Sequence, residues 1–297
     1  MLQRRGIGLR IHSTSLTSEP VTIDTLAPPS TIPPLPQMSP APTRAPGVWT
    51  ALGWVALYFA LQAVGSGMIV VVMAVAAGAF HSLADLARAG EIIHAMLNRP
   101  GMQALLVILA LTLAASMIVL LLHRRWPQLW SLARPPGFGF VRPARASFLL
   151  LAVVIGLAAP IVGGWLTQWL AHGHPVTQDI RQLGESTPLG WRIPLVLVVV
   201  TMGPLVEELL FRGVLLSALL QRWGKLAAIG LSSLAFALAH LPGLDWHAFA
   251  LPDLLLLALA LAWLRLRSES IWPGVIAHGA NNLLAVAAWF IAARPGG

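Results

Sequence analysis

Long apolar segments dominate the chain after residue 47, and short stretches that contain most of the charged residues separate them. Most of these segments have about 20 residues or more, the length that crosses a bilayer as a helix. Seven such segments are predicted, at approximately 50–80, 102–122, 146–170, 193–220, 226–241, 251–264 and 271–293. Because a spanning segment must satisfy its backbone polar groups within itself, the pattern predicts an all-α, polytopic membrane protein.

Two regions depart from this pattern. Residues 1–47 begin with several arginines and continue with many Pro, Ser and Thr residues, and no apolar region follows the arginines within this tail. We therefore expect a disordered Pro-rich tail and not a cleaved signal peptide. Residues 81–100 mix charged and histidine side chains with Leu, Ala and Ile, which predicts an amphipathic helix at the membrane interface.

The charges of the loops predict the orientation. The loop after the second apolar segment contains five arginines and no acidic residue: Arg124, Arg125, Arg134, Arg142 and Arg145. Cytoplasmic loops are enriched in Lys and Arg, so this loop is assigned to the cytoplasm. Alternation along the chain then predicts a multi-pass cell-membrane protein with a cytoplasmic N-terminus and an outside C-terminus.

The composition supports this interpretation. Hydrophobic residues make up 57% of the 297 residues and charged residues only 10%, against about 25% charged residues in typical soluble domains. The net charge is +8, but the basic residues lie in short loops and not in one stripe, so nucleic acid is not an expected partner. The absence of cysteine excludes disulfides, thiolate metal sites and cysteine nucleophiles.

Two acidic residues lie deep inside a predicted span. Glu207 and Glu208 occur in the fourth segment together with Arg212, and each charged side chain near the bilayer centre costs on the order of 2.5–3.5 kcal/mol. Glu208 and Arg212 are four residues apart and share one helix face. Glu207 is rotated by about 100°. The spacing favours a Glu208–Arg212 pair and a Glu207 carboxylate that faces a cavity; a buried cluster that only joins helices is the alternative.

Two histidines lie in the later apolar segments. His240 ends the fifth segment, whereas His278 lies in the seventh, four residues before Asn282 and on the same helix face. Each of these groups alone would fit an interfacial side chain or a polar contact between helices. Together with Glu207, they supply a general base, a partner for a water molecule and donors to an oxyanion, which acyl-transfer hydrolysis requires.

Three motifs occur in order along the chain: Glu207-Glu208-x-x-x-Arg212, Phe236-x-x-x-His240 and His278-x-x-x-Asn282. This set resembles the CPBP (CAAX protease and bacteriocin-processing) family, which includes type II CAAX prenyl endoproteases and Abi-type bacterial proteins. The Ser-Ile-Trp-Pro-Gly sequence at 270–274 also resembles the family's approach to its last motif. The resemblance covers about 190–290, so 190–293 is predicted to be the catalytic core and 48–189 a set of N-terminal membrane helices.

The resemblance implies a role for each motif residue. Glu207 would activate water with His240 as its partner, and His278 and Asn282 would stabilise the oxyanion. Glu208 and Arg212 would hold the geometry of the site. The expected function is therefore an intramembrane endopeptidase that acts on a membrane-associated peptide or protein.

Several alternatives stay open at this point. Zinc is possible, with Glu207, His240 and His278 as ligands, but the His-Glu-x-x-His motif is absent, so we favour a mechanism without a cofactor. A catalytically silent Abi-type immunity or scaffold protein, or a transporter, would also place polar groups in the membrane. The substrate stays open among prenylated tails, lipoproteins and bacteriocin leaders.

Overall fold

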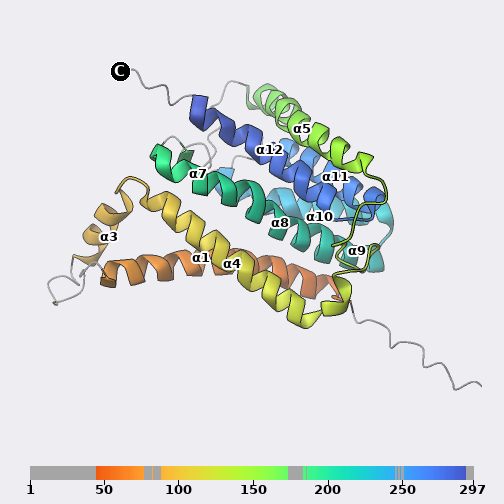
Figure 1. The fold of residues 1–297 in the computed structure, drawn as a ribbon, viewed down its shortest axis with the longest axis horizontal. Coiled ribbons are helices and arrows are strands. Elements are labelled where there is room, and N and C mark those ends of the chain that lie inside the picture. The colour runs from red at the N-terminus through yellow and green to blue at the C-terminus, as the bar shows by residue number, and fades with distance from the viewer. Residues whose placement is uncertain are drawn as a thin grey trace, which may run out of the picture. The chain divides into compact units, whose positions relative to one another are not determined.

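The computed structural model describes residues 45–76, 82, 88–172, 183–184, 186–244, 246, 248 and 251–291, without the side chains of 288 and 291. All regular structure in these residues is helical and none of them lies in a strand, which confirms the predicted all-α class (Figure 1). The predicted tail lies outside the described residues except for its last three, 45–47. Its disorder therefore stays a prediction.

Four helical segments are long and apolar enough to cross a membrane: α1 (Val48–Ala76), α4 (Met102–Arg125), α5 (Ser147–Ala171) and the continuous segment Leu189–Arg222. The three other predicted spans correspond to α10 (Lys225–Ala239), α11 (Leu251–Ser268) and α12 (Trp272–Ile291). Helix α10 has only 15 residues and α11 contains three charged residues. Seven membrane crossings therefore stay a prediction.

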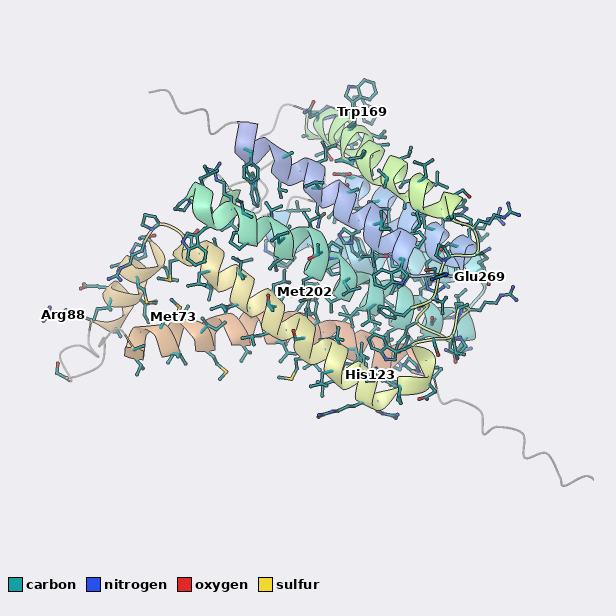
Figure 2. All side chains as sticks on the ribbon, viewed as in Figure 1. Met73, Arg88, His123, Trp169, Met202 and Glu269 are labelled. Carbon is teal, nitrogen blue, oxygen red and sulfur yellow. The ribbon has the colours of Figure 1, made fainter. Side chains whose placement is uncertain are left out.

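Many large apolar side chains on the long helices are exposed and do not belong to the core. On α1 they include Val64, Met68 and Val72, each more than half exposed. Trp169, near the end of α5, projects away from the helix (Figure 2). An apolar surface of this kind is typical of contact with lipid, and a tryptophan near a helix end is typical of the membrane interface.

Helix α3 (Ala89–Leu97) is the described part of the predicted amphipathic segment. Its buried Met96 packs in one cluster with Ala74 of α1, whereas Glu91 on the same helix is exposed. One apolar face and one polar face are what the sequence predicts. The position of α3 at a membrane interface was not tested and stays a prediction.

The segment Leu189–Arg222 changes its helical form along its length. It consists of α7 (Leu189–Leu197), the π-helical turn η2 (Val198–Met202), α8 (Gly203–Glu208), the π-helical turn η3 (Leu209–Leu215) and α9 (Leu216–Arg222). Short π-helical turns are frequent at functional sites. Here they lie on both sides of the short helix that carries the two glutamates.

The other helices pack around this central segment. Helix α1 packs against α4 and against η3, α10 against α11, and α12 against α5 and α8 (Figure 1). The main buried cluster combines side chains from α1, α4, η3 and α10, including Tyr58, Ile118, Leu210 and Phe236. The motif residues of the central segment, α10 and α12 are thereby brought to one region of the structure.

The loop between α4 and α5 fixes the start of α12. Arg265 of α11 is fully buried and donates hydrogen bonds to the carbonyl oxygens of Ala133 (2.8 Å) and Gly137 (2.7 Å). The backbone N–H of Ile271 donates to the carbonyl of Gly139 at 2.8 Å. Because α12 begins at Trp272, these bonds set the position of the helix that carries His278.

Candidate active site

Glu208 and Arg212 form the buried pair that their spacing predicts. The Arg212 Nη1 atom donates to Glu208 Oε1 at 2.9 Å, and both side chains are almost completely buried. Arg212 Nη2 also donates to the carbonyl of Ala258 in α11 at 3.2 Å. A buried charge is tolerated when it is paired and hydrogen-bonded, and this pair joins the central segment to α11.

Glu207 faces a different set of groups. Its Oε2 atom lies 3.5 Å from His240 Nε2 and 3.8 Å from His278 Nε2. The Glu207 side chain is 14% exposed and that of His240 is 29% exposed, whereas His278 is nearly buried. The carboxylates of Glu207 and Glu208 therefore have different neighbours, and Glu207 is the more exposed of the two.

Each histidine is oriented by a contact of its Nδ1 atom. In His240, Nδ1 lies 2.9 Å from the carbonyl oxygen of Phe236, which can only accept, so Nδ1 carries the hydrogen. In its neutral form, His240 then presents the Nε2 lone pair to Glu207. In His278, Nδ1 lies 3.2 Å from Glu208 Oε1, and it donates for the same reason. These tautomers follow from the partners of each ring.

His278 therefore joins the two glutamates, which the sequence interpretation did not predict. One side of its ring contacts Glu208, inside the buried pair, and the other side faces Glu207. Gly274, one turn before His278 on α12, makes this approach possible. A Cβ atom at Gly274 would lie 2.7 Å from Glu208 Oε2, which no normal packing allows. The glycine of the lead-in sequence is thus explained by a close contact between α12 and α8.

The aromatic ring of Phe236 is an apolar group that packs against several polar side chains of the site. Its ring lies at 4.5 Å from the ring of His240 and 5.5 Å from that of His278, between ring centroids. The guanidinium carbon of Arg212 lies 4.4 Å from the same ring. A cation over an aromatic face is attracted to it, and more strongly where water is excluded. Phe236 thus contacts the buried pair and both histidines.

Asn282 lies one turn after His278 on α12. Its Nδ2 atom donates to the carbonyl of Val199 in η2 at 3.0 Å, and its Oδ1 accepts from Asn281 at 3.3 Å. These contacts place the carboxamide against the π-helical turn before α8. The structure brings Glu207, His240 and His278 together, whereas the convergence of Asn282 on the same cavity and its role at an oxyanion stay predictions.

The metal alternative names Glu207, His240 and His278 as ligands. Imidazole nitrogens and a carboxylate are groups that zinc accepts. Within the part of the chain that the structure describes, no group of three or more His, Cys, Asp or Glu side chains has the arrangement of a metal site. Metal dependence therefore stays an open alternative, which chelation can test.

Comparison with known families adds an independent finding. Residues 189–284 match the family described as type II CAAX prenyl endopeptidase Rce1-like. The match contains all three motifs and confirms the resemblance that the sequence indicated over about 190–290. No curated protein and no solved structure matches the chain. Helices α1, α4 and α5 lie outside the matched residues.

Proposed function

We propose that this chain is an intramembrane endopeptidase, because residues 189–284 are an Rce1-like type II CAAX prenyl endopeptidase domain that holds a partly open glutamate against two histidines. The observation that carries the proposal is the position of Glu207. Its carboxylate is separate from the Glu208–Arg212 pair and faces His240 and His278.

Glu207 is the general base in this mechanism. A water molecule held by Glu207 Oε2 and His240 Nε2 loses a proton to Glu207 while its oxygen lone pair attacks the carbonyl carbon of the substrate. The π electrons of the C=O bond move to its oxygen and form the oxyanion. The C–N bond then breaks, and the proton held by Glu207 passes to the leaving amine. A base positioned in this way typically contributes about 10²–10⁴-fold.

His278 and Asn282 stabilise the oxyanion. The cluster contains two carboxylates, Glu207 and Glu208, and one permanent cation, Arg212. In this role His278 acts from Nε2, the ring atom that faces Glu207, while its Nδ1 contacts Glu208 Oε1. Asn282 supplies the amide donor from the same helix. Fixed donors of this kind cost no reorganisation in the transition state.

The favoured mechanism uses no metal. Glu207 and His240 together offer one atom to take the proton of a water molecule and one atom to orient it. The substrate is a peptide or protein at the membrane, and the name of the matched family makes a prenylated CAAX tail the first to test.

The test is proteolysis by purified protein. A farnesylated peptide that ends in the CAAX pattern is incubated with the wild-type protein in lipid nanodiscs, together with the same peptide without the farnesyl group and a pool of other membrane peptides. Products are identified by mass spectrometry, with Glu207→Gln as the inactive control. We expect cleavage by the wild-type protein alone. No cleavage of any probe would overturn the proposal and favour a silent scaffold or a transporter.

We further propose seven membrane crossings with a cytoplasmic N-terminus. The absence of native cysteine makes single-cysteine labelling straightforward. Ser131, in the loop after α4, and Ser186, before α7, are exposed and fall on opposite sides in this topology. In intact cells, an impermeant maleimide should label Ser186→Cys and not Ser131→Cys. The reverse labelling would invert the topology.

A further inference from the structure

Tyr58 has a buried hydroxyl that no protein group satisfies in the described part of the chain. It is the only tyrosine of the sequence and lies within α1, fully buried. Its hydroxyl oxygen is buried and has no hydrogen-bond partner among the described residues. Most buried polar side-chain atoms have such a partner, and those that do not require an explanation.

Tyr58 lies at about the depth of Glu207 in the helix assembly. Val48 and Leu52, at the start of α1, line one pocket together with Leu219 and Arg222, at the end of α9. These two helix ends therefore lie at the same face. Tyr58 is ten residues from Val48, which is roughly 15 Å along a helix, and Glu207 precedes Arg222 by roughly 20 Å.

Packing brings Tyr58 to the side of the segment that carries Glu207. Helix α1 packs against η3 and α9. Tyr58 belongs to the same buried cluster as Val206, directly before Glu207, and Phe236, which lies against both histidines. These contacts place Tyr58 beside the part of the central segment that carries Glu207, and no hydrogen bond joins its hydroxyl to the carboxylate.

The Glu207 carboxylate has a buried hydrogen-bond acceptor that lacks a donor in the described part of the chain. Its Oε2 atom is buried and likewise has no hydrogen-bond partner of normal geometry among the described residues. A phenol hydroxyl is a donor and a carboxylate is an acceptor. A water molecule between them would satisfy both groups, as buried water commonly does in proteins.

We propose that the Tyr58 hydroxyl donates a hydrogen bond to the water molecule that Glu207 activates, and that α1 thereby completes the active site. The role rests on the proposed endopeptidase function. The water donates its two hydrogens to Glu207 Oε2 and His240 Nε2 and accepts one hydrogen from Tyr58. Its remaining lone pair faces the substrate carbonyl. Tyr58 lies outside the residues that match the protease family, 189–284.

The first experiment measures cleavage of the farnesylated CAAX peptide by Tyr58→Phe, which removes only the hydroxyl. We expect kcat to fall by about 10- to 100-fold, which is less than the loss of the base itself, with KM nearly unchanged. The thermal unfolding temperature should stay the same or rise, because the hydroxyl has no protein partner in the native state. Lower stability with full activity would indicate a structural hydroxyl only and overturn the role.

Ser217→Ala is the matched control. Ser217 of α9 also has a fully buried hydroxyl without a hydrogen-bond partner among the described residues, and it is not part of the site. Its removal should leave kcat unchanged. An equal loss of activity in Tyr58→Phe and Ser217→Ala would show that any change in this core slows the enzyme and would overturn the role of Tyr58.

The second experiment needs no activity. Because the chain has one tyrosine, labelling with ¹³Cζ-tyrosine gives one NMR signal. Glu207→Gln should shift this signal, whereas Asp253→Asn, which changes a carboxyl against Gly163 of α5, should not. An unchanged signal in Glu207→Gln would overturn the shared water. A wild-type protein without activity would overturn the protease function, whereas a fully active Tyr58→Phe would overturn only the role of Tyr58.

Discussion

Glu207 and Glu208 are neighbours in the chain, yet the structure gives their carboxylates different surroundings. Glu208 is buried against Arg212 and His278, whereas Glu207 is partly exposed and lies near His240 and His278 without a cation of its own at hydrogen-bond distance. The helix produces this difference, because one residue step rotates the side chain by about 100°. Two adjacent glutamates can thus have different roles: Glu208 stabilises the structure in a buried ion pair, and Glu207 is the proposed general base.

The comparison predicts different outcomes for the same substitution at the two positions. Glu207→Gln should lower turnover by about 10²–10⁴-fold, because a carboxamide cannot take the proton of water, while the protein stays folded and inserted. Glu208→Gln should instead lower thermal stability, since it leaves Arg212 and His278 without their shared acceptor charge. Cleavage rates and unfolding temperatures measure the two effects. Equal loss of folding in both variants would contradict the division of roles.

Arg212→Ala tests the structural role of the Glu208–Arg212 pair by removing its cation. Removing the partner of a buried charge typically costs about 3–5 kcal/mol, so this variant should be poorly expressed and unstable in the membrane. Arg212→Lys is the control, because it keeps the charge but loses the second donor to Ala258. Its stability should lie between those of the wild type and Arg212→Ala. A stable Arg212→Ala protein would show that Glu208 is satisfied in another way.

Asn282→Ala tests the predicted oxyanion donor on α12. If the carboxamide stabilises the oxyanion, turnover should fall by about 10²–10³-fold, while the KM of the peptide stays nearly the same. Asn281→Ala, one position away on α12, is the matched control and should have a smaller effect. A similar loss in both variants, together with lower stability, would indicate that Asn282 only holds the carbonyl of Val199 in η2.

Phe236→Leu tests the aromatic ring that contacts both the buried Glu208–Arg212 pair and the two histidines near Glu207. Aromatic contacts of this kind are worth about 0.5–1.5 kcal/mol each beyond burial, which corresponds to up to about tenfold in rate if one contact orients a catalytic group. We expect lower turnover and a lower unfolding temperature together, because the ring contacts His240, His278 and Arg212. Phe211→Leu, whose ring packs on Phe236 at 5.1 Å, should lower stability with less effect on turnover.

These features differ in how far the sequence predicted them. The Glu208–Arg212 pair depends only on local helix spacing, so the sequence predicted it. Among the described residues, each long helix overlaps a predicted apolar segment, although the bounds differ by several residues. The fourth segment, predicted at 193–220, extends over Leu189–Arg222. The π-helical turns on both sides of α8 are not marked by any pattern of apolar and polar residues in the sequence. They became visible only in the structure.

Contacts between distant helices could not be predicted in the same way. His278 and Glu208 are 70 residues apart in the chain, and their contact depends on how α12 packs on α8. The bond from Asn282 to Val199 depends on the same packing. The position of Tyr58 required knowledge of where α1 lies, and no motif marks that helix. Composition and spacing identify the polar groups, whereas helix packing decides which of them meet.

Chelation is expected to have the smallest effect. It distinguishes a mechanism in which Glu207 activates water directly from one in which a bound metal does so. A metal would lower the pKa of bound water and supply the nucleophile, so a metalloenzyme loses activity on chelation and regains it with zinc. In the glutamate mechanism, Glu207 takes the proton directly, and activity should survive dialysis against EDTA and phenanthroline. Metal content measured by mass spectrometry, beside the cleavage rate, decides the case. Stoichiometric zinc together with zinc-dependent recovery would overturn the glutamate mechanism and leave the protease function standing, because Glu207, His240 and His278 would then act as ligands on the same side of the site.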